Sequence, residues 1–223
     1  MLKNGKELTI NGAIFDMDGT LLNTLTDISY AVNSVLCKYN LPKHSLRRYK
    51  YFIGDGLKEL VRRSLPTQFN GSFEKIYFDI KKEYKSNLNS QTVVYKGINE
   101  LLEYLISRNI KIGINTNKPH EFAIKCIRKY FDDYDILTVG SNNDRPLKPD
   151  PSGVLEIINQ FDLNPKNCVM IGDSNVDIFT AKNANIISFG ALWGFRSQSE
   201  LLKSGANYLF KNPIDIIRFI KSI

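Results

Sequence analysis

The sequence predicts an α/β protein: a doubly wound, Rossmann-like parallel sheet forms the core, and a helical cap domain is inserted after the first strand. From residue 92 to the C-terminus, short apolar strands alternate with amphipathic helices, as is typical of a parallel sheet covered by helices. Between residues 21 and 91, apolar residues recur at helical spacing and no convincing strand occurs. One more apolar strand, at Ile14 and Phe15, precedes that helical segment.

The length of the chain, 223 residues, suffices for one substantial core with a smaller inserted domain. We expect residues 1–20 and 92–223 to form the α/β core and residues 21–91 to form the cap domain. The sequence contains no internal repeat and no low-complexity linker.

The cap domain is expected to be a set of short helices. Its first helix begins after Asn23 or Thr24, which can cap it, and ends near Pro42. Gly54-Asp55-Gly56 interrupts the helical stretch that follows, because glycine favours turns over helix interiors. Two further helices cover about residues 57–65 and 73–84.

In the core, helices and strands are expected to alternate. The helices span residues 98–107, 121–130, 153–161, 176–183 and 213 to the end, and the strands span 110–116, 135–139, 168–171, 186–189 and 208–210. The carboxyl ends of parallel strands meet at one edge of the sheet, where open α/β folds bind their ligands. Because the insert leaves the sheet at this edge, we expect it to act as a lid that excludes water and selects substrates.

Two aspartates, Asp16 and Asp18, follow the first strand directly. Gly19 ends the strand, so one carboxylate can face a substrate and a metal ion while the other lies beside it, an arrangement that suits a nucleophile and a proton donor. A calcium loop would need Asp or Asn at position 20 and glycine at 21, where this chain has Thr20 and Leu21. A solvated turn remains the alternative for this stretch alone.

Polar residues also follow the later strands. Thr116 and Asn117 can hold phosphoryl oxygens through a hydroxyl, an amide and backbone N–H groups, although helix capping is the favoured explanation for this cluster in isolation. Lys148 lies between prolines that fix its direction, so its ammonium can neutralise Asp16 and bind phosphate, unless it is simply a solvated loop lysine.

Asp173 ends the strand at 168–171, and Asp177 lies one helical turn further, so both can face the same cavity. Each could be an ordinary helix-capping acid. However, polar clusters at four strand ends are hard to explain as four separate caps. A third acid near Asp16 and Asp18 suits Mg²⁺, which prefers oxygen ligands and bridges to substrate phosphate.

Together these four clusters resemble the motifs of the haloacid dehalogenase-like hydrolase superfamily. The matching stretches are Asp16-Met17-Asp18-Gly19-Thr20, Thr116-Asn117-Lys118, Lys148-Pro149-Asp150-Pro151 and Gly172-Asp173-Ser174-Asn175-Val176-Asp177. The resemblance implies that Asp16 is the nucleophile that forms an aspartyl-phosphate and that Asp18 is the general acid and base. It further implies that Thr116 and Lys148 hold the phosphoryl group.

The same resemblance implies a Mg²⁺ cofactor. Asp16, the main chain of Asp18, and Asp173 would bind the ion, and Asp177 would reach it through water or orient Lys148. The dehalogenases themselves lack the second aspartate and the metal, so Asp18 argues for a phosphatase.

Finer features are similar to the phosphoglycolate phosphatase branch. They are Thr20-Leu21-Leu22-Asn23-Thr24, Phe52-Ile53-Gly54-Asp55-Gly56 and Leu192-Trp193-Gly194-Phe195-Arg196. The chain departs from common patterns at Asn23, where many relatives carry Asp, and at Asn115, which is usually apolar. The resemblance implies hydrolysis of a small phosphomonoester, 2-phosphoglycolate in particular. The glycine-rich loop of Gly54, Asp55 and Gly56 should contact the leaving group, with Asn117 as a further substrate contact.

Several alternative functions stay open. A pyrophosphatase or a nucleotidase would use the same chemistry, and a phosphosugar mutase would retain the phosphoryl group. The mutase is disfavoured because such relatives tend to carry an arginine in the cap loop, where this chain has Gly54-Asp55-Gly56. A nucleic-acid-binding module is suggested by the net charge of +7, but the basic residues are dispersed over the chain.

The remaining expectations concern the environment of the protein. Cys37, Cys126 and Cys168 form no C-x-x-C pair, so we expect reduced packing residues and neither disulfides nor a zinc site. No apolar run reaches membrane-spanning length, and the charged N-terminus lacks a signal-peptide core. We therefore expect a cytoplasmic monomer or weak dimer that acts on a small phosphorylated metabolite, without nucleic acid or membrane as a partner.

Overall fold

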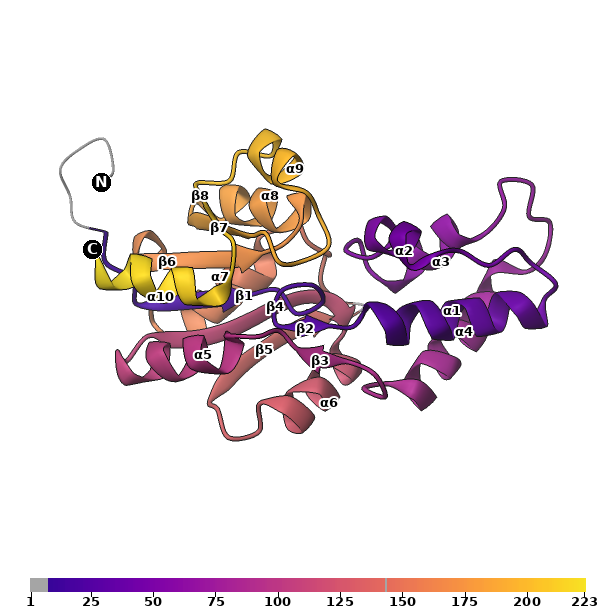
Figure 1. Ribbon diagram of the computed structural model, residues 1–223, viewed down its shortest axis with the longest axis horizontal. Helices are drawn as coiled ribbons and strands as arrows, with labels where there is room; N and C mark the ends of the chain where they lie inside the picture. The colour runs from indigo at the N-terminus through magenta and orange to yellow at the C-terminus, as the bar shows by residue number, and fades with distance from the viewer. Residues whose placement is uncertain (1–7, 143) are drawn as a thin grey trace.

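The computed structural model describes residues 8–142 and 144–223. These residues form a six-stranded parallel sheet in the order β5-β4-β1-β6-β7-β8 (Figure 1). The strands are β1 (Gly12–Phe15), β4 (Lys111–Pro119), β5 (Ile136–Ser141), β6 (Cys168–Gly172), β7 (Ile187–Ala191) and β8 (Tyr208–Phe210). The chain builds outward from β1 through β4 to β5 and then crosses to β6 on the other side of β1. This strand order confirms the predicted doubly wound parallel sheet. In such sheets, ligands bind at the point where the direction of chain progression reverses.

Helices cover both faces of the sheet, and the side chains of β1 point alternately to the helices on either face. Ala13 and Phe15 pack into one cluster with residues of α5 (Ile98–Ser107), α6 (His120–Tyr130) and α10 (Pro213–Lys221). Ile14 points to the opposite face, towards α7 (Ser152–Gln160) and α8 (Asn175–Asn183). Because neighbouring strand residues face opposite sides, a continuous apolar strand of this kind is buried on both faces.

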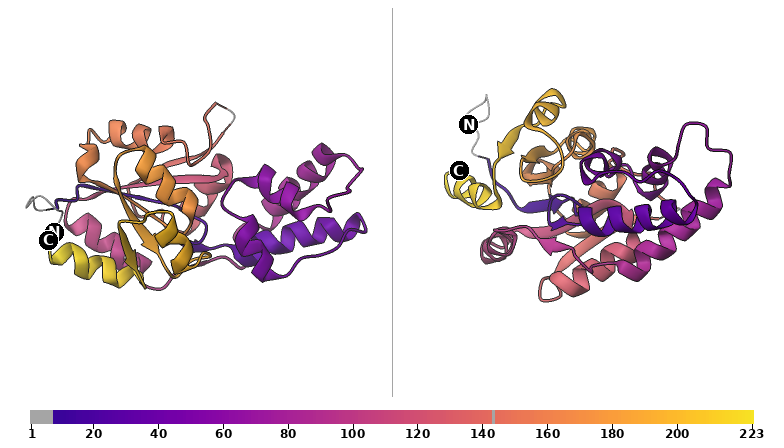
Figure 2. Two further views of the ribbon diagram at one scale, coloured as in Figure 1. Left: turned by 90° about the horizontal axis from the view of Figure 1, so that it is seen from above. Right: turned by 45° about the vertical axis from the view of Figure 1, so that its right-hand side comes forward.

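A separate helical lobe extends from the carboxyl edge of the sheet (Figure 2). It consists of α1 (Leu25–Lys38), α2 (Leu46–Phe52), α3 (Leu57–Ser64) and α4 (Phe73–Asn87). These helices share their own cluster of buried side chains, which Phe122 and Phe195 of the core join. The lobe corresponds to the predicted cap.

The two connections between cap and core pair with each other. β2 (Leu22–Asn23) and β3 (Val93–Val94) form a two-stranded antiparallel sheet, in which Leu22 faces Val94 and Asn23 faces Val93. The expectation of no strand between residues 21 and 91 was therefore wrong at β2, because a strand of two residues shows no periodicity. Leu21 and Leu22 are buried in the core cluster.

Other differences are local. β4 extends past residue 116 to Pro119, and α9 (Gln198–Lys203) and the 3₁₀ turn η1 (Pro165–Asn167) were not predicted. All three cysteines are free, with Cys126 and Cys168 buried as expected and Cys37 exposed. In the part of the chain described, no helix combines the length and apolarity that crossing a membrane requires. The charged N-terminal residues considered above lie outside the described residues.

Candidate active site

The loop after β1 carries Asp16 and Asp18 and is held by its own backbone. The Met17 carbonyl accepts N–H bonds from Thr20, Leu21 and Leu22. Gly19 adopts a positive φ of 97°, and a Cβ there would lie only 2.5 Å from Oδ2 of Asp173. Glycine is therefore required at this position for two reasons: the turn has a positive φ, and the ends of β1 and β6 approach each other closely.

Lys148 occupies the centre of the site. Its Nζ donates to Oδ1 of Asp16 at 2.7 Å and to Oδ1 of Asp177 at 2.6 Å. Burial disfavours the charged ammonium, but the two carboxylates outweigh it and raise the pKa of Lys148 well above its usual value. The ammonium is therefore fixed and charged beside Asp16.

Asp173 is almost completely buried close to Asp16. Its Oδ1 accepts from the Thr20 hydroxyl at 3.2 Å, and its Oδ2 accepts from the backbone N–H of Phe195 at 2.6 Å. Burial raises the pKa of Asp173 well above its usual value, and repulsion from Asp177 and Asp16 adds to this effect.

The surroundings of Asp16 also raise the pKa of its carboxyl. Burial, reinforced by Asp177, raises its pKa to about 6, against the opposing attraction of Lys148. Asp177 also accepts from the backbone N–H and hydroxyl of Ser174 at the start of α8. Three carboxylates thus share a buried space with one ammonium.

The end of β4 presents Thr116, Asn117 and Lys118 to the site. The register between β4 and β5 shifts between Asn115 and Pro119, and such an irregularity re-aims side chains that would otherwise alternate across the sheet. The Thr116 hydroxyl lines the pocket beside Asp16 and Asp18 and accepts the backbone N–H of Lys118 at 3.3 Å.

The Asn117 amide is engaged by backbone groups. Its Oδ1 accepts the Lys148 N–H at 2.8 Å, and its Nδ2 donates to the carbonyls of Lys148 at 3.1 Å and Gly54 at 2.9 Å. This side chain therefore connects β4, the lysine loop and the cap. Because these bonds use both amide hydrogens, the side chain positions Lys148 and the cap loop rather than presenting donors to a ligand.

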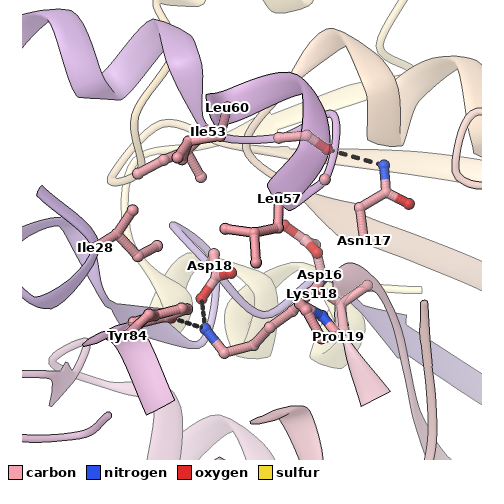
Figure 3. Close-up of a pocket in the computed structure, with 13 residues that line it drawn as sticks. Asp16, Asp18, Ile28, Ile53, Leu57, Leu60, Tyr84, Asn117, Lys118 and Pro119 are labelled. Carbon is pink, nitrogen blue, oxygen red and sulfur yellow. Dashed lines mark hydrogen bonds and ion pairs between the residues drawn. The ribbon is translucent and has the colours of Figure 1, made fainter. Parts of the chain in front are cut away.

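A pocket opens between this edge and the cap (Figure 3). Its floor includes the acids and β4 residues, and the cap supplies an apolar wall. The lining residues are Asp16, Asp18, Ile28, Ile53, Gly54, Gly56, Leu57, Leu60, Tyr84, Thr116, Asn117, Lys118 and Pro119. The structure brings together every site residue expected from the sequence except Asp55, whose carboxylate instead pairs with Arg63 at 2.6 Å.

Two residues without an expected role reach into the region between cap and core. Lys118 donates to Asp18 and to Tyr84 of α4. Arg196 lies in the loop after β7, and its guanidinium binds the carbonyls of Lys50, Tyr51 and Ile53 at the C-terminal end of α2. Each is the last residue of a stretch that carries the family resemblance, and this was the available signal.

Comparison with known proteins identifies the family. The family model of haloacid dehalogenase-like hydrolases matches residues 13–191, which includes all four polar clusters. The chain belongs to this hydrolase family. The six-stranded parallel sheet with an inserted helical lobe agrees with that membership.

Curated relatives of the chain include several phosphoglycolate phosphatases. The chain is 31% identical over 195 residues to the phosphoglycolate phosphatase of Psychrobacter arcticus, which covers 82% of this chain and 83% of that protein. It is 28% identical over 221 residues to that of Nitrosospira multiformis, covering 96% and 97%. The protein is therefore a phosphatase of the phosphoglycolate phosphatase-like branch.

Solved structures agree with this assignment. A predicted phosphoglycolate phosphatase from Haemophilus somnus superposes with a TM-score of 0.86 at 26% identity and covers 94% of this chain and 97% of that one. A predicted phosphatase from Clostridium acetobutylicum gives 0.81 at 25% identity, covering 96% and 100%.

The acid cluster of this hydrolase fits a divalent cation. One oxygen from each of Asp16, Asp173 and Asp177 lies within 4.8 Å of the others. The single ammonium of Lys148 leaves two negative charges of the cluster uncompensated. An all-oxygen donor set with this charge matches the preference of Mg²⁺.

Proposed function

We propose that this protein is a Mg²⁺-dependent phosphomonoesterase that hydrolyses 2-phosphoglycolate through an aspartyl-phosphate on Asp16. The observation that carries the proposal is the position of Lys148 between Asp16 and Asp177, with Asp173 within reach of both acids. This arrangement fixes one carboxylate at the pocket floor and holds an ammonium beside it, where a phosphoryl group would enter.

In the first step, an Asp16 carboxylate oxygen forms a bond to phosphorus as the bond from phosphorus to the ester oxygen breaks. Asp18 donates its proton to the departing alkoxide, so the alcohol leaves neutral. In the second step, Asp18 takes a proton from water, which attacks phosphorus and releases phosphate from Asp16. Lys148 and the Thr116 hydroxyl stabilise the charge on the phosphoryl oxygens throughout.

Asp16, Asp173 and the main chain of Asp18 would hold the cation, and Asp177 would keep Lys148 in place. When bound, Mg²⁺ supplies neutralisation of the negative charge on the transferred phosphoryl group. The remaining features of catalysis come from the chain: the cap covers the pocket, and its apolar wall excludes water that would compete before the first step.

The proposed substrate is supported by the apolar cap wall of the pocket and by the names of similar proteins. The relatives described above are called phosphoglycolate phosphatases. The wall of Ile28, Ile53, Leu57 and Leu60 offers no side-chain partner for sugar hydroxyls, and leaving such groups unpaired costs about 1–3 kcal/mol each. This favours a small leaving group over a nucleoside or a hexose.

The test is release of phosphate from 2-phosphoglycolate, pyrophosphate, a nucleoside monophosphate and a hexose phosphate, with Mg²⁺ or with chelator. We expect Mg²⁺-dependent release that Asp16→Asn abolishes and that the exposed control Asp132→Asn retains. Activity of Asp16→Asn near that of the wild type would refute the nucleophile. Interconversion of phosphosugars without phosphate release would replace hydrolysis by the mutase reaction.

A further inference from the structure

Three parts of the chain meet beside Asp18 at a buried lysine. Lys118 from the end of β4 donates through Nζ to Oδ1 of Asp18 at 2.9 Å and to the hydroxyl of Tyr84, which comes from α4 of the cap (Figure 3). The Lys118 side chain is only 1% exposed. Its ammonium also lies 4.9 Å from the centre of the Tyr84 ring. A fixed positive charge therefore adjoins the expected proton donor.

Lys118 and Tyr84 each have one hydrogen-bond donor that these contacts do not use. An ammonium has three N–H bonds, and Asp18 and Tyr84 accept two of those of Lys118. Since the Tyr84 oxygen accepts from Lys118, its own O–H bond remains to donate. Within residues 8–142 and 144–223, neither remaining donor has a protein acceptor. Both residues line the pocket.

We propose that Lys118 and Tyr84 form a subsite for a negatively charged group on the leaving group of the substrate. The inference rests on the proposed function, because it assumes that Asp18 protonates the ester oxygen. That oxygen would then lie within hydrogen-bond distance of Asp18 and so within roughly 6 Å of Lys118 Nζ. A carboxylate joined to the same carbon as the ester oxygen falls inside this range.

The rest of the pocket supports an anionic group at this one place. Of the lining residues in the described chain, Lys118 is the one with a positive charge. The facing cap residues Ile28, Leu57 and Leu60 are apolar, so an anion positioned there would lose its hydration without compensation. Charge-assisted bonds to Lys118 and Tyr84 would therefore select short acids, in which the negative group stays close to the ester oxygen.

A competing explanation is that Lys118 merely neutralises Asp18. The two explanations differ in what removing the ammonium does to different substrates. If Lys118 acts only on Asp18, its loss slows all phosphomonoesters by the same factor. If it binds the leaving group, its loss slows charged substrates more than uncharged ones.

The experiment compares 2-phosphoglycolate with its carboxamide analogue, which has the same shape without the negative charge. The readout is the ratio of kcat/KM for the two compounds in the wild type, Lys118→Met and Tyr84→Phe. We expect the ratio to favour the acid in the wild type and to fall roughly 10- to 100-fold in Lys118→Met, the equivalent of one charge-assisted hydrogen bond. Tyr84→Phe should shift it in the same direction by a smaller factor.

Pyrophosphate provides a second arm, since its leaving group is also a short anion. If kcat/KM falls more in Lys118→Met for both 2-phosphoglycolate and pyrophosphate than for the uncharged carboxamide, the subsite is assigned to anions in general. A larger fall for 2-phosphoglycolate alone would assign it to carboxylates. An unchanged ratio in both variants would overturn the proposal. If Lys118→Met does not fold, the kcat/KM ratio of acid to carboxamide in the wild type and in Tyr84→Phe still tests the proposal. A ratio near one in both proteins contradicts an anion subsite.

Failure of the proposed function would look different. The wild type would then release no phosphate from p-nitrophenyl phosphate or from any other phosphomonoester in the presence of Mg²⁺. Release from p-nitrophenyl phosphate with no preference for the acid over the carboxamide would retain the phosphatase and reject the subsite.

Discussion

Phe195 donates its backbone N–H to Oδ2 of Asp173 at 2.6 Å, and this bond ties the loop after β7 to the proposed cation site. The next residue, Arg196, binds three carbonyls at the end of α2, and its guanidinium lies 5.2 Å from the centre of the Tyr51 ring. A short backbone segment thus contacts the acid cluster at one end and the cap at the other. The position of the cap and the geometry of Asp173 are mechanically connected.

Replacing Arg196 by Gln should loosen the closed cap. The variant loses the guanidinium that donates hydrogen bonds to the carbonyls at the C-terminus of α2. We therefore expect KM for 2-phosphoglycolate to rise by about 10-fold or more, the equivalent of one charge-assisted hydrogen bond. Limited proteolysis should also cut the cap faster. Arg218→Gln, at an exposed arginine of α10 that pairs with Asp215, is the matched control. Equal KM values for both variants would contradict the connection.

Replacing Lys148 by Met should remove activity and stability together. Two buried carboxylates, Asp16 and Asp177, would lose their shared counter-charge, and breaking a buried pair typically costs about 3–5 kcal/mol. Urea unfolding without Mg²⁺ measures this loss. The double variant Lys148→Met/Asp177→Asn should recover part of the stability but none of the activity. A single variant as stable as the wild type would show that Lys148 does not neutralise the acids.

Mg²⁺ should stabilise the protein more at pH 7.5 than at pH 5.5. In the folded chain the pKa of Asp16 is about 6, above the 3.8 of an ordinary aspartate, and that of Asp173 is raised as well. A carboxyl with a raised folded-state pKa destabilises the fold as pH rises from about 4 through 6, because the unfolded state gives up its proton more readily. Mg²⁺ held by these acids would replace the proton and remove this penalty.

The measurement is Tm with and without Mg²⁺ at both pH values, for the wild type and Asp173→Asn. Without metal at pH 7.5, Asp173→Asn should melt above the wild type, because one of the repelling charges is gone. It should also lose the Mg²⁺-dependent increase in Tm. A wild-type increase that is equal at the two pH values would argue against metal binding by these acids.

The sequence predicted the residues of the acid cluster because their positions follow from topology. Asp16 and Asp173 end neighbouring parallel strands, and Lys148 follows a third, so a correct assignment of strands brings them to one edge. The strands themselves were recognisable because they are buried on both faces and read as continuous apolar runs.

The contacts between cap and core could not be predicted in the same way. Tyr84 occupies an ordinary apolar position of an amphipathic helix, and Lys118 is the third residue of a motif without a distinct signal of its own. Their meeting depends on the angle at which the cap lies over the sheet, which hydrophobic periodicity does not encode. The contacts of Arg196 with the cap could not be predicted for the same reason, whereas β2 and β3, with two residues each, are too short to show a period.

The pairing of β2 with β3 has a consequence for how this architecture can change. Since Leu22 and Asn23 are paired with Val94 and Val93, the chain leaves the sheet and returns to it at points about 5 Å apart, the spacing of an antiparallel pair. A tight hairpin could close that gap without moving any strand. The insert is thus a replaceable module: another lobe could be grafted at the same two positions, changing which molecules enter while the phosphoryl-transfer residues of the sheet stay where they are.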